Sequence, residues 1–198
     1  MKVYIASRNA GKIRELKAIF AKSPLRLSTY RKYEDVLEVA GSYAGNALLK
    51  AQTLATALRD ARVSAAVLAD DSGLEIDALG GRPGVYSARF GGPELEWPQR
   101  RLALLEELRG IPPYRRTARF VCALAFVEPN REAIIATGRV DGYILETQRG
   151  TDGFGYDALF LYPPLGRSFA SLSEKEKNAV SHRRVATDAL LAMLADRV

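Results

Sequence analysis

The sequence has one cysteine, one histidine and no long apolar run. Cys122 lies in the apolar segment RFVCALAFV, where we expect a small buried side chain, and an intrachain disulfide is excluded. His182 has no cysteine or second histidine beside it, which makes a zinc site a poor interpretation. No GxSxG pattern supports a serine hydrolase. With neither a membrane-length run nor the apolar core of a signal peptide, the sequence predicts a cytoplasmic protein without a membrane partner.

The composition is that of an ordinary globular chain. Of the 198 residues, 47% are hydrophobic and 26% are charged, so we expect a single domain over residues 1–198, in two lobes. The formal net charge of +6 favours anionic partners, and on this evidence nucleotides, nucleic acid and acidic lipids all remain open.

Strand and helix patterns alternate along the first half. KVYIAS predicts a strand, SRNAG a turn, and KIRELKAIFAK a helix. A second helix is predicted from Asn46, as its N-cap, to Arg62, and leads into the strand VSAAVLA. Glycines and prolines between residues 73 and 93 indicate strand fragments and exposed loops.

The second half combines a hairpin with helices. A helix is expected from about Pro98 to Arg109, and then TARFVCALAFVEP and REAIIATGRVDGYIL as two antiparallel strands, the second ended or bulged at Gly142. Ser173 and Glu176 have capping-box spacing at the start of a C-terminal helix. These patterns predict an α/β fold with a mixed central sheet flanked by helices.

The segment SRNAGK, residues 7–12, joins the first strand to the first helix. Such a loop directs backbone N–H groups and the positive end of the helix dipole at one point, which favours a phosphate. Lys12 adds a positive charge there. The Walker pattern GxxxxGK[ST] is absent, and the alternative is a simple turn.

Two adjacent carboxylates, Asp70 and Asp71, end the apolar run VSAAVLA. Successive side chains of a strand point to opposite faces, so only one of the two faces a given site. Glu38, Glu75 and Asp77 are candidate partners, and a magnesium ion would need only a few such oxygen ligands. The alternative is that one aspartate caps the following loop while the other is solvated.

Two further segments carry side chains suited to a nucleotide. GFGYD places Phe154 and Tyr156 in a glycine-rich loop where an aromatic ring can stack on a base, although a tight turn with one aromatic in the core is the alternative. In EKNAVSHRR, Lys177 and Ser181 are one helical turn apart with His182 at the edge of that face. An isolated histidine beside arginines is also typical of a surface or cap residue.

Together and in this order, these segments resemble the inosine triphosphate pyrophosphatase family. The match runs through SRNAGKIRELK, NALLKA, LADDSGLEIDALGGRPGVYSARFGG, TARFVCALAFV, GFGYD and EKNAVSHR. The resemblance implies hydrolysis of ITP, dITP and XTP to the monophosphate and pyrophosphate, assisted by Mg²⁺. It also implies an elongated α/β fold with a cleft between two lobes, and a homodimer.

The resemblance assigns roles to individual residues. Asp71 and Lys50 are the catalytic pair, with Asp71 as base and Lys50 on phosphate, and the metal ligands are Glu38 and Asp71. The residues that bind the triphosphate are Ser7, Arg8, Asn9, Ala10, Gly11 and Lys12. The residues that contact the rest of the nucleotide are Ser72, Phe154, Gly155, Tyr156, Asp157, Lys177, His182 and Arg183.

Three positions depart from the family pattern, namely Gly45, Ala158 and Ser171, which replace a Glu, a Pro and a Glu. Gly45, Ser171 and the high pI motivate a rival interpretation, a catalytically weak nucleotide- or RNA-binding protein, with arginine pairs at 100/101, 115/116 and 183/184 as the attraction for RNA. These pairs lack interleaved aromatic residues, so we expect solvated surface or a substrate funnel and no stable nucleic-acid partner. A third possibility is a pyrophosphatase that prefers modified pyrimidines.

Overall fold

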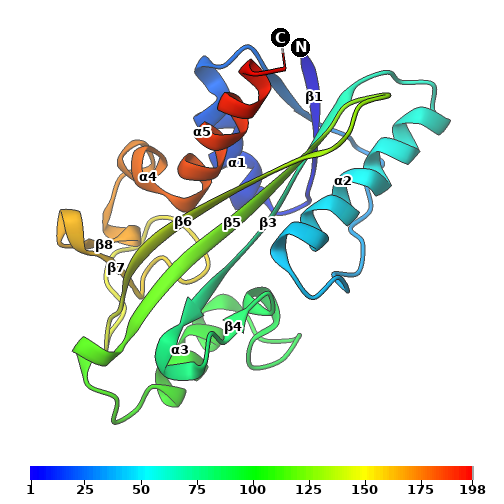
Figure 1. Cartoon of the computed structure of the whole chain (residues 1–198). Helices are drawn as coiled ribbons and strands as arrows, with labels where there is room; N and C mark the ends of the chain where they lie inside the picture. The colour runs from blue at the N-terminus through cyan, green and yellow to red at the C-terminus, as the bar shows by residue number, and fades with distance from the viewer. Residues whose placement is uncertain (198) are drawn as a thin grey trace. The chain divides into compact units, whose positions relative to one another are not determined.

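The computed structural model describes residues 1–197 and contains a mixed eight-stranded sheet with helices packed on it (Figure 1). The strands are β1 (Lys2–Ala6), β2 (Arg26–Thr29), β3 (Ala66–Ile76), β4 (Pro83–Gly84), β5 (Thr117–Val127), β6 (Ile134–Ile144), β7 (Phe160–Tyr162) and β8 (Arg167–Ser168). The α-helices are α1 (Ala10–Ile19), α2 (Tyr43–Asp60), α3 (Trp97–Glu107), α4 (Glu174–Val180) and α5 (His182–Ala195).

The strand order is β2-β1-β3-β5-β6-β7-β8, with β4 paired to β3. β1 is parallel to both β2 and β3, whereas β4 is antiparallel to β3 and β7 is antiparallel to β6 and β8. The predicted mixed α/β sheet flanked by helices is therefore confirmed. The expected hairpin is also present, because β5 and β6 lie side by side and are joined by a short turn (Figure 1).

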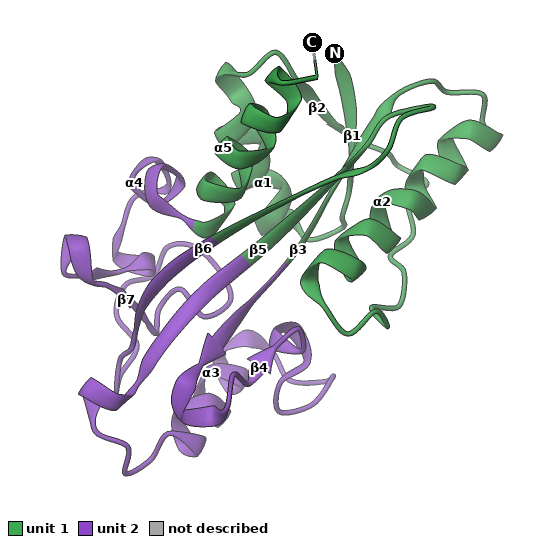
Figure 2. Ribbon diagram, in the orientation of Figure 1, with its two compact units in different colours: residues 1–71, 122–138, 182–198 green, residues 72–121, 139–181 purple. Residues whose placement is uncertain are grey.

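The chain divides into two compact units (Figure 2). Unit 1 comprises residues 1–71, 122–138 and 182–198, and unit 2 comprises residues 72–121 and 139–181. The chain passes from one unit to the other within β3, β5 and β6, each of which is an 11-residue strand, and once more between α4 and α5.

Unit 1 buries both faces of its part of the sheet. Along β3, Ala66 and Leu68 belong to a core cluster shared with α1 and α5, whereas Val67 and Ala69 belong to a cluster shared with α2. This alternation is the period-two pattern of a strand covered on both faces. It continues into the next two residues, so Asp70 is directed to the α1 and α5 face and Asp71 to the α2 face.

Small residues allow the helices of unit 1 to pack closely on the sheet. Ala47 and Ala51 of α2 lie against Ala69 and Ala123, and all four are fully buried. On the other face, a Cβ added to Gly138 of β6 would lie 2.2 Å from the carbonyl oxygen of His182 and 2.3 Å from the amide nitrogen of Ala186. Glycine is therefore required where the first turn of α5 crosses β6.

Unit 2 has a core built around aromatic rings. Phe120, Phe160 and Phe169 pack with ring centroids 4.7 to 5.9 Å apart, and Leu74, Ile76 and Leu104 complete the cluster. Gly142 does not end β6, which continues to Ile144. A Cβ there would lie 2.3 Å from the carbonyl oxygen of Leu161, so this glycine permits close approach of β7 instead.

Several predicted boundaries are wrong for local reasons. α2 begins at Tyr43 because Ser42 is its N-cap, and Asn46 lies inside the helix rather than capping it. β3 does not end before Asp70 but continues through both aspartates to Ile76. The capping box at Ser173 and Glu176 is confirmed, but Ser181 adopts an extended conformation that separates α4 from α5.

Candidate active site

Asp70 is the centre of a buried network of charges in unit 1. Its carboxylate accepts from Nζ of Lys12 at 2.6 Å, from Nε of Arg183 at 3.0 Å and from Sγ of Cys122 at 3.2 Å. Glu15 completes the network, since its carboxylate lies 2.9 Å from Nη1 of Arg183. The two carboxylates and the two positively charged side chains thus neutralise one another, which allows these charges to be buried away from water.

The network fixes the charge state of Asp70. Burial alone would raise the pKa of its carboxyl, but Arg183 and Lys12 outweigh burial and hold the pKa well below its usual range. Cys122 is buried as expected, and burial followed by the Asp70 charge raises the pKa of its thiol. Asp70 is therefore an ionised carboxylate that the protein itself neutralises.

Arg183 belongs to the buried network around Asp70. Its guanidinium is 3% exposed and binds Asp70 and Glu15. Because these two carboxylates engage Nε and Nη1, Arg183 holds Asp70 and joins α5 to α1, and its contact with a nucleotide stays a prediction.

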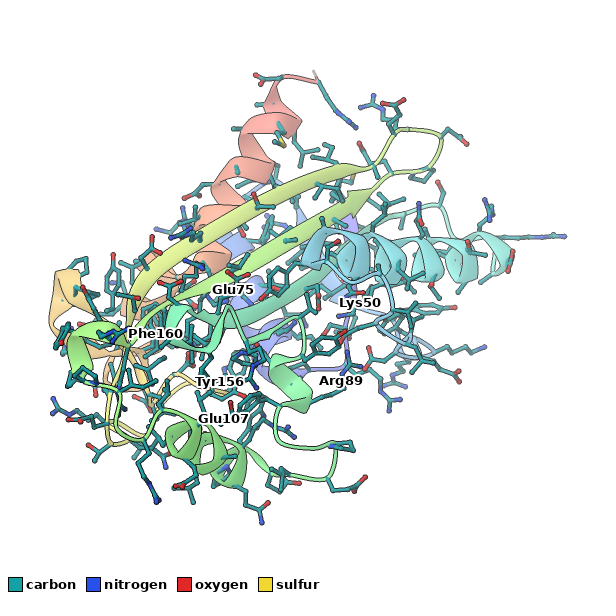
Figure 3. The ribbon with its side chains drawn as sticks, turned by 60° about the horizontal axis from the view of Figure 1, so that its bottom comes forward. Lys50, Glu75, Arg89, Glu107, Tyr156 and Phe160 are labelled. Atoms are coloured by element: carbon teal, nitrogen blue, oxygen red, sulfur yellow. The ribbon has the colours of Figure 1, made fainter. Side chains whose placement is uncertain are left out.

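Asp71 lies on the opposite face of β3, against α2. Its Oδ1 accepts from Nζ of Lys50 at 2.9 Å and its Oδ2 from Nδ2 of Asn46 at 3.1 Å. Glu38 binds the same Lys50 ammonium (Figure 3 shows Lys50 on helix α2). Asn46 also accepts from the amide of Ala40 at 3.0 Å, so it ties the segment that carries Glu38 to the helix.

This cluster suits a cation. Burial would lower the pKa of Lys50, but the carboxylates of Asp71 and Glu38 outweigh burial and raise it. Burial raises the pKa of Asp71, with Lys50 opposing. Two carboxylates that converge on one ammonium form a hard-oxygen donor set of the kind Mg²⁺ prefers, with water and phosphate oxygens left to complete the coordination. No group of three or more acidic, histidine or cysteine side chains with metal-site geometry occurs among residues 1–197.

Neither of the other candidate carboxylates joins Asp71. Glu75 accepts from Nε of Arg119 at 2.7 Å, and Asp77 accepts from Nη2 of the same arginine at 2.9 Å and from Thr117 at 2.7 Å. Both belong to unit 2. The sequence left three partners open for Asp71, and the structure selects Glu38.

The SRNAGK segment forms the turn that the sequence predicted. Asn9 is the N-cap of α1, and its Oδ1 accepts from the amide of Lys12 at 3.1 Å, while Oγ of Ser7 accepts from the amide of Asn9 at 3.1 Å. Arg8 is exposed, and Gly11 is half-buried. Lys12, in the first turn of α1, is the cation that links this turn to Asp70.

Unit 2 contains a hollow of about 430 Å³ lined by the glycine-rich loop. Phe154 lies in its wall with Nζ of Lys177 4.8 Å from the ring centroid. Oδ2 of Asp157 accepts from that same Nζ at 2.5 Å and from the amide of Phe154 at 2.7 Å. The carboxylate therefore stabilises the turn and orients the lysine, and an aromatic face and a cation lie together beside an open volume.

Tyr156 does not line this hollow. Its ring is 2% exposed, stands edge-on to Trp97 with centroids 5.3 Å apart, and its hydroxyl donates to the carbonyl of Ser87 at 3.0 Å. For this residue the alternative interpretation, an aromatic within the core, is correct (Figure 3). The sequence analysis missed Arg101, which lines the hollow and donates to the carbonyl of Gly155 at 2.9 Å.

The other predicted contact residues are placed separately. Ser72 is half-buried on β3 in unit 2, and His182 is 2% exposed at the start of α5 in unit 1. Gly155 and Ala158 line the hollow of unit 2. A larger hollow of about 730 Å³ lies in unit 1 and contains none of the predicted site residues.

The arginine pairs are not the exposed basic patches that the RNA-binding interpretation requires. In each pair one guanidinium is buried: Arg100 donates to carbonyls of residues 90, 92 and 95, Arg116 to carbonyls of residues 108 and 111, and Arg183 binds Asp70. Arg184 forms a helical ion pair with Asp188. Half of the charge counted as surface is therefore structural.

Two of the three departures are accommodated locally. Ser171 lies 2.8 Å from Oγ of Ser168, which donates to the carbonyl of Arg149 at 2.6 Å, so a small hydroxyl network occupies the place of the missing carboxylate. At Gly45 a Cβ would lie 2.7 Å from Cβ of Ala40, because the segment after Glu38 passes close to α2. No structural account follows for Ala158.

Fold and site together define an α/β protein whose carboxylate and lysine clusters suit a phosphorylated ligand. The Ham1 family profile matches residues 3–193, and the chain belongs to the Ham1 family. It is 45% identical over 184 residues to the dITP/XTP pyrophosphatase of Geobacillus kaustophilus (91% of this chain, 88% of the relative). It is 43% identical over 197 residues to that of Exiguobacterium sibiricum (98% and 97%). The structure of the Staphylococcus aureus Ham1 protein is similar, with a TM-score of 0.85 and 36% identity over the whole of both chains.

These comparisons confirm the family that the sequence motifs indicated. The relatives are named as nucleoside triphosphate pyrophosphatases, in agreement with the expected class of enzyme. Among the described residues, no helix has both the length and the hydropathy needed to cross a membrane.

Proposed function

We propose that this chain hydrolyses non-standard purine nucleoside triphosphates, namely ITP, dITP and XTP, to the monophosphate and pyrophosphate. The observation that carries the proposal is the cluster of Asp71, Lys50 and Glu38, because it combines a shielded carboxylate with a lysine and a second carboxylate on one face of β3. The names of the relatives support the same activity.

Several residues of the chain are proposed to act on the triphosphate, each in a different role. Nζ of Lys50 and Nζ of Lys12 offset the negative charge that develops as the α–β anhydride bond breaks. The carboxylate of Asp71 orients the attacking water and accepts its proton, and Asn46 holds that carboxylate in place. The Ser7–Lys12 turn supplies amide donors at the N-terminus of α1.

We propose Mg²⁺ as the cofactor, held by Glu38 and Asp71. When bound, such an ion supplies Lewis-acid stabilisation of the phosphate oxygens. Glu38 and Asp71 already converge on one cation, the Lys50 ammonium, which supports this assignment.

Phe154, Lys177 and Asp157 are proposed to recognise the base. The Phe154 ring offers a stacking surface, and the Lys177 ammonium, oriented by Asp157, offers a donor to a 6-carbonyl oxygen. A donor at that position favours hypoxanthine and xanthine and leaves the amino group of adenine without an acceptor. His182 and Ser72 complete the proposed contacts, and Arg183 acts by holding Asp70. A homodimer and a cytoplasmic location belong to the same proposal.

Pyrophosphate release tests the proposal. ITP, dITP, XTP, GTP, ATP and a modified pyrimidine triphosphate are compared with and without Mg²⁺, for the native chain and for Asp71→Asn. We expect Mg²⁺-dependent release from the first three, weak release from the others, and a loss of at least about a hundredfold in Asp71→Asn. Glu107→Gln, which alters an exposed ion pair with Arg82, is the control and keeps full activity. Absence of release with ITP still bound would instead establish a nucleotide-binding protein.

A further inference from the structure

The segment that carries Glu38 has one buried side chain. Within residues 30–42 only Tyr33 is buried, at 6% exposure, while Leu37 and Val39 on either side of Glu38 are 79% and 76% exposed. The ring of Tyr33 packs in the same core cluster as Ala47 and Ala51 of α2. Tyr33 therefore anchors the Glu38 segment to the helix that carries Lys50.

The hydroxyl of Tyr33 is unusual because it is buried and makes no hydrogen bond within 3.5 Å among the described residues. A buried hydroxyl without a partner destabilises the folded state by about 1 to 3 kcal/mol. Phenylalanine would fill the same space among alanines without that cost. Packing explains the ring of Tyr33 but gives no reason for its oxygen.

The surroundings of the hydroxyl are charged. Lys50 lies on α2 between Ala47 and Ala51, which contact the Tyr33 cluster. Burial raises the pKa of Tyr33 to about 12, and the Asp35 carboxylate contributes through its charge and as the acceptor nearest the hydroxyl, just beyond normal hydrogen-bond geometry. Lys50 lowers this pKa and Glu38 raises it. The phenol is therefore protonated near neutral pH and can only serve these carboxylates as a donor.

The carboxylate of Glu38 is bound to the ammonium of Lys50. The ion pair uses Oε1 of Glu38, and a divalent cation on the same carboxylate competes with the lysine for its negative charge. A carboxylate that ligates a metal is normally held by a hydrogen bond to an outer group, and removing that group lowers metal affinity or activity by about 10- to 100-fold.

We propose that Tyr33 is a positioning residue of the active site, whose buried hydroxyl donates to the Glu38 carboxylate when that carboxylate binds the divalent cation. This inference rests on the proposed function, since it concerns the same carboxylate pair. In this proposal the Tyr33 hydroxyl gains its hydrogen-bond acceptor when the metal is bound, and that hydrogen bond orients the Glu38 carboxylate.

Tyr33→Phe tests the inference through two readouts that a purely structural role would move differently. We expect the free energy of unfolding without metal to stay equal or to rise, because an unpaired hydroxyl is removed. We expect affinity for Mn²⁺, measured by calorimetric titration without nucleotide, to fall about tenfold. Tyr30→Phe is the matched control, because the Tyr30 ring is only half-buried, packs edge-on against Tyr4 and lies at the margin of the same cluster. It leaves both quantities unchanged.

Three results would overturn the inference. Unchanged Mn²⁺ affinity in Tyr33→Phe excludes the hydroxyl from the metal-bound state, and a loss of stability without metal shows a structural role. Asp35→Asn is measured alone and combined with Tyr33→Phe. If Asp35→Asn alone loses as much Mn²⁺ affinity as Tyr33→Phe, and the double variant loses no more, the hydroxyl serves Asp35 rather than Glu38. Because Mn²⁺ binding is measured without substrate, failure of the proposed hydrolysis by the native chain is recognised separately.

Discussion

At the scale of single residues, Asp70 and Asp71 are neighbours in sequence with different partners in space. Asp70 binds Lys12, Arg183 and Cys122 on the α1 and α5 face of β3, and Asp71 binds Lys50 and Asn46 on the α2 face. The period-two geometry of the strand separates them. One carboxylate is neutralised by the fold, so the other is left for the candidate cation site.

Asp70→Asn is expected to destabilise the protein by about 3 to 5 kcal/mol, because it leaves Arg183 and Lys12 with one partner fewer in a buried site. The folded-state pKa of Asp70 lies below its ordinary value of 3.8, so the unfolded chain binds the proton more tightly. Its contribution to stability is complete above that ordinary value and is lost as the pH falls below it towards the folded-state pKa. Urea unfolding from about pH 6 to pH 3 measures this.

The slope of unfolding free energy against pH distinguishes this effect from general acid denaturation. The native chain loses stability more steeply than Asp70→Asn below about pH 4. The exposed pair of Arg82 and Glu107 gives the control, since Glu107→Gln changes stability by less than about 1 kcal/mol at any of these pH values. Parallel curves for the native chain and Asp70→Asn would mean that Asp70 is not held ionised by its neighbours.

At the scale of elements, the N-terminus of α2 contains Gly45, one of the three departures from the family pattern. Gly45 donates its amide to Oγ of Ser42, the N-cap, and lies close enough to Ala40 that any Cβ would be 2.7 Å from that side chain. Asn46, the next residue, binds both Ala40 and Asp71. The glycine therefore belongs to a close packing of the Glu38 segment on the helix.

Gly45→Glu restores the family residue but is not expected to raise activity. The new Cβ displaces Ala40 and weakens its hydrogen bond to Asn46, which disturbs both Glu38 and Asp71. Overpacking of this kind costs about 1 to 3 kcal/mol. Thermal unfolding and pyrophosphate release are measured for Gly45→Glu and for Gly45→Glu with Ala40→Gly. We expect the second change to recover stability, and a more active single variant would contradict this account.

Most of the helices and strands could be predicted from the sequence. The strand, turn and helix of residues 2–19, the capping box at Ser173 and the paired β5 and β6 strands follow from local periodicity and capping, and all are present. The length of β3 and the start of α2 were misjudged. β3 continues because Lys12, Arg183 and Lys50 stabilise two charged residues inside the strand. α2 begins earlier because Ser42, and not Asn46, is its N-cap.

At the scale of the whole molecule, the net charge of +6 is compatible with an anionic small substrate more than with RNA. Three of the six paired arginines have buried guanidiniums that bind backbone carbonyls or carboxylates. The remaining positive charge acts at a distance through its field and is screened by salt.

We expect kcat/KM for ITP to fall roughly tenfold between about 0.05 and 0.5 M salt at constant free Mg²⁺, because the field that attracts the triphosphate is screened. The turnover rate at saturating ITP should change little over the same range, since bound charges are shielded from the solvent. Steady-state kinetics at several salt concentrations measure both. A kcat/KM that does not depend on salt would show that the net charge has no part in substrate capture.

The sequence by itself determined the family, the order of the elements and the residue types of the site, because these depend on motifs, local periodicity and capping that neighbours along the chain provide. Only the tertiary structure decided which carboxylate each lysine serves, that Arg183 holds Asp70, that Tyr156 lies in the core and that Tyr33 buries an unpaired hydroxyl. These pairings join residues from 12 to 113 positions apart, and whether a charge is buried beside a partner depends on packing that no local pattern encodes.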